Sequence, residues 1–191
     1  MKITDCQVLL TTTLSATQSS APKSTPINKI AGLILEMARA YESDGISFFV
    51  SGDPVNALAG FYYGFGWLHF GLSSGLLMIT TSSGCPFLEH QDVFQQQHRE
   101  KLEEKAYRYA HLLDTALSSV ECAPDRATIS HGFAERIHLL AAVYARRGNY
   151  FLKSGLLEDA VASFSYGHGW LDAGVTAGFF SIVAERDLFT V

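Results

Sequence analysis

Charged residues and cysteines are both scarce in this chain of 191 residues. Lys, Arg, Asp and Glu make up only 17% of it, whereas apolar residues make up 48%. This composition excludes a charge-rich disordered chain and supplies enough apolar side chains for a sizeable core. The net charge is −5, so no positive surplus favours binding to nucleic acid. The three cysteines, Cys6, Cys85 and Cys122, form neither a CxxC pair nor an even set, which indicates spare thiols in a cytoplasmic protein.

The sequence also lacks the motifs of the common enzyme classes. It contains no glycine-rich phosphate loop, no nucleophile elbow and no pattern of paired carboxylates. The apolar stretch 8–10 is interrupted at once by three threonines, so we do not expect a signal peptide. These absences leave the question of catalysis open but weigh against an enzyme, and no cofactor is expected.

A shift of 103 residues matches the chain to itself without a gap. Between 31–79 and 134–182, 19 of 49 positions are identical, which predicts an internal duplication. The most similar segments are Tyr63-Gly64 with Tyr166-Gly167 and Gly66-Trp67-Leu68 with Gly169-Trp170-Leu171. We therefore predict two units, the first at 1–88 and the second at 92–191.

Each unit has the pattern of three helices. Thr25-Pro26 and Asp53-Pro54 place a capping side chain before proline, which is typical of a helix start. We expect the third helix of the first unit to run from Asp53 to the Ser-Ser-Gly cluster at 82–84. In the second unit we expect helices at about 92–120, 130–153 and 157–184, the first with a solvated charged face at 99–105. The predicted fold is all-α: two tandem three-helix up-and-down bundles, either separate or merged into one six-helix body with pseudo-twofold symmetry.

The second unit resembles a known family. Tyr144, Gly148, Gly155 and Phe164, followed by the segment YGHGWLDAG at 166–174, resemble the archaeal domain of unknown function number 357. The first unit departs from that pattern at two positions, with Phe65 in place of His168 and His69 in place of Asp172. The resemblance implies a three-helix bundle per copy and implies no reaction, because none is established for the family. Some spacings are also similar to a tetratricopeptide repeat, but the period of 103 differs from the ~34 of that repeat.

Small residues form a stripe along each expected third helix. The stripe consists of Gly60, Gly64, Gly71 and Gly75 in the first unit and Ser163, Gly167, Gly174 and Gly178 in the second. Each mid-helix glycine costs about 0.8–1 kcal/mol relative to alanine, so the repetition predicts close helix packing. The stripe could serve packing inside one bundle, an interface between copies or chains, or a ligand groove. We expect Gly71 and Gly174 to touch another helix backbone, and Trp67 and Trp170 to be core or interface anchors.

His168 and Asp172 lie four residues apart, on one face of the expected helix. Three interpretations remain open: a structural hydrogen bond in which Asp172 orients His168, a metal site, and acid–base chemistry. A metal would need further ligands, and the sequence does not place His131 or His138 nearby. The favoured function is a non-enzymatic protein-interaction or scaffold module. The alternative is a metal-binding protein or single-site enzyme that uses His168 and Asp172.

The third helices are also the expected contact between copies. In a symmetric pair, equivalent residues meet near the axis. On this hypothesis His69 and Asp172 should face each other, with Phe65 in a buried contact. The alternative is that the two residues lie on separate surfaces and differ by drift. A homodimer or a protein partner could use the same helices. Residues 54–83 carry no formal charge, but no lysine or arginine flanks them and the matched segment carries several acidic residues, so we expect no membrane insertion.

Overall fold

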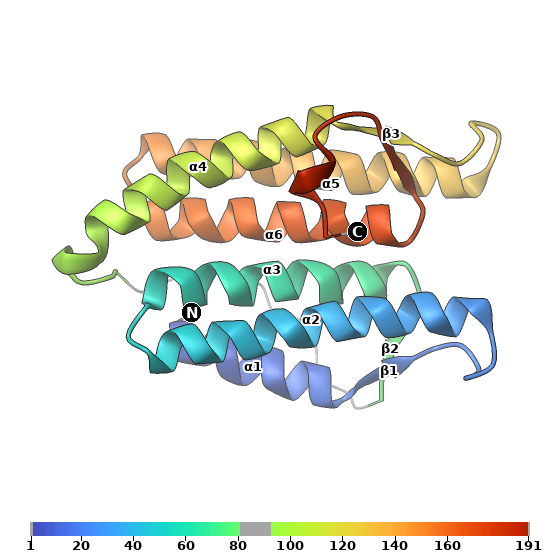
Figure 1. Ribbon diagram of the computed structural model, residues 1–191, viewed down its shortest axis with the longest axis horizontal. Helices are drawn as coiled ribbons and strands as arrows, with labels where there is room; N and C mark the ends of the chain where they lie inside the picture. The colour runs from blue at the N-terminus through green and yellow to red at the C-terminus, as the bar shows by residue number, and fades with distance from the viewer. Residues whose placement is uncertain (1, 81–92, 191) are drawn as a thin grey trace.

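The computed structural model describes residues 2–80 and 93–190 and is a predominantly helical body with four short strands (Figure 1). Its helices are α1 (Ile3–Ser15), α2 (Pro26–Val50), α3 (Pro54–Ser73), α4 (Arg99–Ser118), α5 (Ile129–Lys153) and α6 (Leu157–Thr176). Its strands are β1 (Thr17–Ser19), β2 (Leu77–Ile79), β3 (Val120–Cys122) and β4 (Phe180–Ile182). Two short 3-10 helices complete the structure, η1 (Gln96–His98) and η2 (Arg186–Leu188). The predicted all-α fold is confirmed.

The two copies stack through their third helices. In Figure 1, α3 and α6 lie in the middle and both run from left to right, with α1 and α2 below them and α4 and α5 above. Most side chains of α3 and α6 are buried, because each helix packs against its own copy on one side and against the other copy on the opposite side. The six helices therefore form one merged body.

Capping side chains start three of the long helices, and two of these caps, Thr25 and Asp53, are those that the sequence predicts. The Thr25 hydroxyl accepts a hydrogen bond from the Asn28 amide at 3.2 Å, and the Asp53 carboxylate accepts one from the Asn56 amide at the same distance. Thr128 caps α5 in the same way as Thr25 caps α2. These caps satisfy amides that have no partner within the first helical turn.

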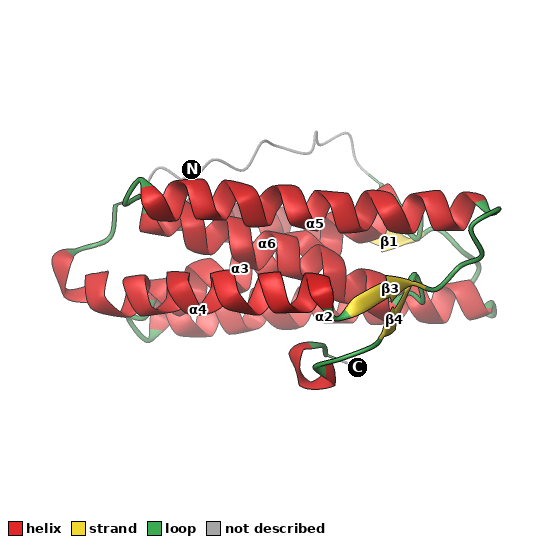
Figure 2. Ribbon diagram, turned by 90° about the horizontal axis from the view of Figure 1, so that it is seen from above, coloured by secondary structure: helices red, strands yellow, loops and turns green. Residues whose placement is uncertain are grey.

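The third helices end earlier than expected. They stop at Ser73 and Thr176, and Gly75 and Gly178 follow with φ angles of +75° and +80°. Glycine adopts this left-handed conformation without the penalty of a Cβ, so these two glycines terminate their helices and do not belong to the packing stripe. The chain then forms β2 or β4, which pair antiparallel with β1 and β3 respectively. Figure 2 shows these strand pairs at one end of the body.

The first helix of the second copy is shorter and less exposed than expected. It begins at Arg99, and Lys105, which we expected on a solvated face, is only 4% exposed. Among the cysteines, Cys6 is buried and Cys122 is half-buried, and no disulfide joins these two residues. Cys85 and the cluster at 82–84 lie outside the described residues.

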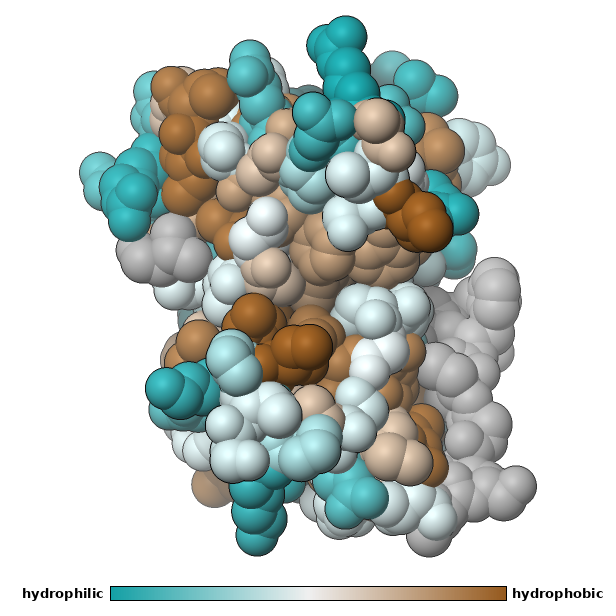
Figure 3. All heavy atoms as spheres, turned by 90° about the vertical axis from the view of Figure 1, so that its right-hand side faces the viewer, coloured by the Kyte–Doolittle hydropathy of each residue, from teal (hydrophilic) through white to brown (hydrophobic). Residues whose placement is uncertain are grey.

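Apolar side chains are also exposed at the end where the strands lie. Figure 3 views the molecule from that end and shows apolar surface on both copies. The exposed side chains on elements that begin or lie there include Ile27, Met78, Ile129 and Val183. Within residues 2–80 and 93–190, no helix combines the length and apolar character needed to cross a membrane.

Candidate functional site

The backbones of the two copies touch at Gly66 and Gly169, which are equivalent under the 103-residue shift. A Cβ on Gly66 would lie 2.6 Å from the carbonyl oxygen of Tyr166 and 2.9 Å from the Cα of Gly169. A Cβ on Gly169 would lie 2.5 Å from the carbonyl oxygen of Tyr63. Real Cβ atoms do not approach backbone this closely, so α3 and α6 can pack as they do only because both residues are glycine.

Gly71 and Gly174 have a different role from the one expected. A Cβ on Gly71 would meet the side chain of Leu77, and one on Gly174 would meet the side chain of Phe180. Both neighbours belong to the strand that follows within the same copy. The prediction of a helix–helix backbone contact at these two residues is therefore wrong, because the early end of each third helix brings a strand residue onto the glycine.

His69 and Asp172 each bind a tyrosine of the other copy. The Tyr63 hydroxyl donates to Asp172 Oδ2 at 2.7 Å, and His69 Nδ1 lies 2.9 Å from the hydroxyl oxygen of Tyr166. Tyr63 and Tyr166 are equivalent, so one pattern occurs on both sides of the interface with aspartate in one copy and histidine in the other. The expected pairing of His69 with Asp172 is therefore replaced by two separate bonds to tyrosine. Phe65, as expected, is buried.

His168 and Asp172 also have separate partners. Asp172 is fully buried and accepts hydrogen bonds from Tyr63 and from the amide and hydroxyl of Thr190. His168 Nε2 lies 3.1 Å from the carbonyl oxygen of Leu188, and because a carbonyl only accepts, Nε2 carries the proton. Burial lowers the pKa of His168, although Asp172 opposes this shift. The structure thus gives no hydrogen bond in which Asp172 orients His168.

The tail after β4 therefore holds the side chains of His168 and Asp172 against the helices. Within the described residues, no group of three or more His, Cys, Asp or Glu side chains could hold a metal ion. His131 instead lies 2.9 Å from the carbonyl oxygen of Pro124, and His138 lies 3.0 Å from that of Leu117, so neither joins His168.

Trp67 and Trp170 are buried in the packed interior, with 0% and 5% of their surface exposed. The ring of Phe70 packs edge-to-face on Trp170 across the copies, with centroids 5.9 Å apart. Both tryptophans leave Nε1 without a hydrogen-bond partner among the described residues, which indicates that their contribution is apolar packing. This agrees with their expected role as anchors.

A pocket of about 380 Å³ lies between the copies. Its floor and walls come from α2 and α3 of the first copy, from α4 and α6 of the second, and from the tail that follows β4. The lining residues that carry polar groups or rings include Tyr41, Asp44, Phe48, Asn56, Tyr63, Lys105, Tyr109, Phe164, Ser165 and His168. The pocket therefore combines aromatic walls with a few convergent polar groups, which is typical of small-molecule sites.

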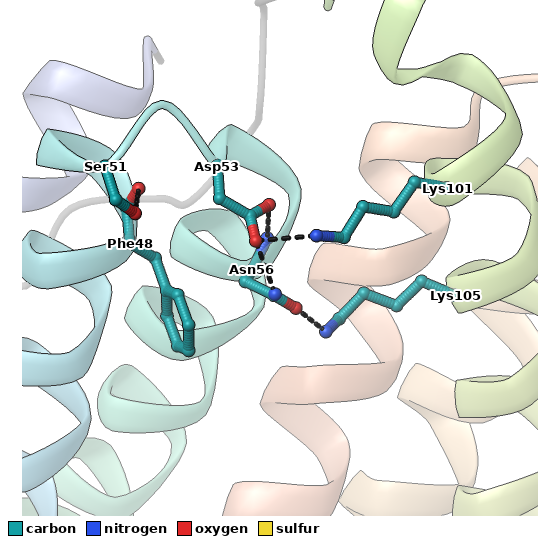
Figure 4. Close-up of polar contacts among 6 residues, drawn as sticks. All are labelled: Phe48, Ser51, Asp53, Asn56, Lys101 and Lys105. Carbon is teal, nitrogen blue, oxygen red and sulfur yellow. Dashed lines mark hydrogen bonds and ion pairs between the residues drawn. The ribbon is translucent and has the colours of Figure 1, made fainter.

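A chain of polar contacts crosses one end of this pocket (Figure 4). Lys101 Nζ lies 2.6 Å from Asp53 Oδ2, the same carboxylate accepts from Asn56 Nδ2 at 2.6 Å, and Lys105 donates to Asn56 Oδ1. Burial opposes the effect, but hydrogen bonds from Lys101 and Asn56 lower the pKa of Asp53. Lys101 thus neutralises the negative charge of Asp53, whereas Lys105 donates its hydrogen bond only to the neutral amide oxygen of Asn56.

Lys105 is the buried cation of the pocket. Its ammonium lies 4.7 Å above the centre of the Tyr109 ring, which gives a favourable cation–π contact. Burial, aided by the nearby charge of Arg108, lowers the pKa of Lys105 to about 8. Within residues 2–80 and 93–190, no carboxylate lies within ion-pair distance of it. A buried ammonium without an acidic partner is uncommon, because burying a charge is unfavourable unless it is paired.

The duplication supplies an internal comparison for the pocket. Six lining residues, Tyr41, Asp44, Asn56, Ala59, Gly60 and Tyr63, correspond to Tyr144, Arg147, Asp159, Ala162, Ser163 and Tyr166 on the other side of the interface. The pocket at that second place measures only about 10 Å³. Bulkier side chains stand at the second place: Tyr62 where the open pocket has Ser165, and Arg147 where it has Asp44. Phe65 stands where the open pocket has His168.

Sequence reasoning singled out His168 but missed Lys105, Ser165 and the three tyrosines of the pocket. Helical periodicity alone places Lys105 among charged neighbours on an exposed face, and only the packing of the two copies buries it. One signal was present in the sequence: positions that differ between otherwise similar copies, such as Ser165 against Tyr62, mark where the two sides have diverged.

Comparison with known proteins agrees with the duplication. The search of curated proteins and the search of solved structures each gave no match. One family model matches the chain twice, at residues 7–77 and 108–180, so that one match falls in each copy. These two segments cover most of the sequence, and the chain therefore belongs to the family described as Protein of unknown function (DUF357).

Proposed function

We propose that this protein is a non-enzymatic binding protein whose ligand is a small molecule held in the pocket between the two copies. The observation that carries the proposal is the difference between the two equivalent places at the interface. One is open at about 380 Å³, and the other is filled to about 10 Å³. Close packing is the default for protein interiors, so a void of this size at one of two equivalent places argues for a retained site.

The Ser165 hydroxyl supports this proposal independently. Ser165 lines the open pocket and is 1% exposed, yet its Oγ has no hydrogen-bond partner within the described residues. An unsatisfied buried hydroxyl is unfavourable by about 1–3 kcal/mol. A ligand that hydrogen-bonds to Oγ would remove this penalty, which fits a binding site better than a purely structural cavity.

The alternative of a metal protein or single-site enzyme has less support. Asp172 is saturated by Tyr63 and Thr190, and His168 Nε2 is held by the Leu188 carbonyl. Their first task is therefore to attach the C-terminal tail to α6. His168 also lines the pocket, so it can contribute to ligand contact without chemistry.

The proposal is tested by screening a library of small organic molecules with ligand-observed NMR on the full chain. The variants Ser165→Tyr and His168→Phe place the first copy's residue at the corresponding position of the second copy and should fill the pocket. We expect binders of the unmodified protein to lose at least 10-fold in affinity in Ser165→Tyr. Ser181→Tyr adds the same side chain at an exposed position and serves as the matched control.

Two results would contradict the proposal. The first is a library in which no compound binds the unmodified protein. The second is a set of binders that Ser165→Tyr and His168→Phe leave unaffected, with both variants folded by circular dichroism. His168→Phe keeps the test decisive, because it introduces less bulk than tyrosine at a position that is already half-buried.

A protein-interaction module remains the second candidate. The third helices were the expected partner surface, but they cover each other within one chain. The apolar side chains at the strand end of the molecule, Ile27, Met78, Ile129 and Val183, support a contact there instead. Light scattering of the full chain tests this candidate for a second copy as partner, with Ile129→Ser as the variant that should weaken self-association. An archaeal origin and a cytoplasmic location are proposed on the sequence alone.

A further inference from the structure

We propose that the ligand of this pocket is a small aromatic carboxylate that carries a hydroxyl at its opposite end. The Lys105 ammonium holds the carboxylate, the rings of Tyr41, Tyr63 and Tyr109 contact the aromatic body, and Ser165 binds the hydroxyl. This inference rests on the proposed function, because it assigns a chemical class to the same site.

The first step is the charge of Lys105. An ammonium has three N–H donors, and the structure shows one of them used, by Asn56. The acid nearest to this contact, Asp53, is already bound to Lys101 and to Asn56. A carboxylate on the ligand would supply the missing counter-charge in a place where water screens it poorly.

The second step excludes a cationic ligand. Asp44 also lines the pocket, and aromatic rings can bind cations as well as apolar groups. However, Asp44 is exposed, and an exposed charge contributes little to a salt bridge. Lys105 is buried, and the neighbouring cations of its helix, Lys101 and Arg108, are paired with Asp53 and Glu104. Lys105 is therefore the charge at this end of the pocket that a ligand carboxylate can pair with.

The third step is the shape of the body. Tyr41 and Tyr63 pack with ring centres 4.3 Å apart, and the Tyr109 ring lies beneath Lys105. Flat apolar walls of this kind favour a flat ring. A volume of about 380 Å³ lies at the lower end of the range for ligand pockets, which limits the ligand to a small molecule.

The fourth step is the length of the site. Asn56, which binds Lys105, and Tyr63 are seven residues apart on α3, which corresponds to about 10 Å of helix. At the Tyr63 end, the tyrosine hydroxyl donates a hydrogen bond to Asp172 and is also hydrogen-bonded to Tyr41, so its oxygen offers a ligand only an acceptor. The Ser165 hydroxyl has no partner among the described residues, and Ser165 lines the same pocket as Tyr63. A ligand hydroxyl could donate to one of these oxygens and accept from the other.

The test compares four matched probes by isothermal titration calorimetry with the full chain: 4-hydroxyphenylacetate, its neutral amide, the amine tyramine and phenylacetate. We expect 4-hydroxyphenylacetate to bind at least 10-fold more tightly than the amide or the amine. Phenylacetate, which lacks the hydroxyl, should bind several-fold more weakly, and Ser165→Ala should remove that difference.

Lys105→Gln should reduce the ratio between carboxylate and amide to about one. Lys101→Gln removes a lysine of the same helix that does not line the pocket, and it should leave the ratio above 10-fold. The inference is overturned if the amide or the amine binds as well as the carboxylate, if Lys105→Gln preserves the ratio, or if none of the probes binds. These results would not contradict the proposed function if the library screen finds other compounds whose binding Ser165→Tyr abolishes. The proposed function fails if the screen finds no binder.

Discussion

Tyr63 of the first copy donates its hydroxyl proton to Asp172 of the second copy over 2.7 Å, and this bond joins the two halves of the molecule beside the pocket. Asp172 is fully buried, so its negative charge depends on the donors that surround it. The bond also turns the Tyr63 oxygen into a pure acceptor on the pocket side. One contact therefore contributes both to the cohesion of the copies and to the polarity of the site.

A double-mutant cycle with Tyr63→Phe and Asp172→Asn should show direct coupling. Tyr63→Phe alone should destabilise the protein by about 1.5–3 kcal/mol, because it removes a hydrogen bond to a charged group. We expect an interaction free energy of about 0.5–3 kcal/mol from urea unfolding of the four proteins. A cycle between His69→Gln and Asp172→Asn is the control and should be closer to additive, because those residues bind different tyrosines. Equal coupling in the two cycles would contradict this assignment of partners.

Gly66→Ala and Gly169→Ala should each destabilise the protein by about 1–3 kcal/mol or more. The added methyl would lie within 2.6 Å of a carbonyl oxygen on the opposite helix, and backbone cannot move away as a side chain can. Gly32→Ala is the matched control: nothing lies within 4 Å of its Cβ, so it should stabilise α2 by up to about 1 kcal/mol. Thermal unfolding measures all three. Stabilisation by Gly66→Ala would show that the copies do not meet at this residue.

The sequence predicted the elements of the fold better than their contacts. The 103-residue shift and the Thr25-Pro26 and Asp53-Pro54 starts were enough to predict six helices, because capping and periodicity are local. The stripe of glycines predicted close packing, which Gly60 and Gly64 make against α2 of their own copy. The glycines at the crossing of α3 and α6, Gly66 and Gly169, lie outside the stripe. Which residues meet at the crossing depends on how two helices are rotated about their axes, which no local pattern specifies. The burial of Lys105 was missed for the same reason.

Ser165→Ala should leave the stability of the ligand-free protein unchanged or raise it by about 1 kcal/mol. The Ser165 hydroxyl is buried without a partner, so its removal ends an unfavourable desolvation. Ser119 is the matched control, since it is 2% exposed and its hydroxyl donates to the Thr115 carbonyl at 2.8 Å. Ser119→Ala should destabilise by about 0.5–1.5 kcal/mol. Urea unfolding of the two variants in the absence of ligand compares them, and a larger loss in Ser165→Ala would mean that its hydroxyl has a structural partner.

Acidification should destabilise the protein through His69. Burial lowers the pKa of His69 from 6.5 to about 4, so the folded protein keeps the ring neutral where the unfolded chain binds a proton. The contribution of the neutral His69 ring to the free energy of unfolding is therefore complete above pH 6.5. It is lost as the pH falls from 6.5 to about 4, by up to about 3 kcal/mol. His168 shifts in the same direction. Urea unfolding between pH 7 and 4.5 should show a shallower loss in His69→Gln, and an unchanged slope would argue against a neutral, buried ring.

Lys105→Met should stabilise the ligand-free protein while it weakens ligand binding. At pH 7 the buried ammonium has no carboxylate partner among the described residues, and replacing such a charge with an apolar side chain of similar length is expected to stabilise the protein by about 1–3 kcal/mol. The pKa of Lys105 is lowered from 10.5 to about 8, so the unfolded chain binds more protons than the folded protein above pH 8. The stability of the unmodified protein should consequently rise from pH 8 to about 9.5, below the range in which the tyrosines ionise.

Lys105→Met should lack that rise, and Lys101→Met, which removes an exposed ion pair, should change stability by less than about 1 kcal/mol. Urea unfolding at pH 7, 8, 9 and 9.5 decides the matter: a destabilised Lys105→Met protein with an unchanged pH slope would mean that Lys105 serves the fold and not a ligand. A gain in stability together with a loss of carboxylate binding is the combination expected of a residue retained for its ligand at the expense of the fold.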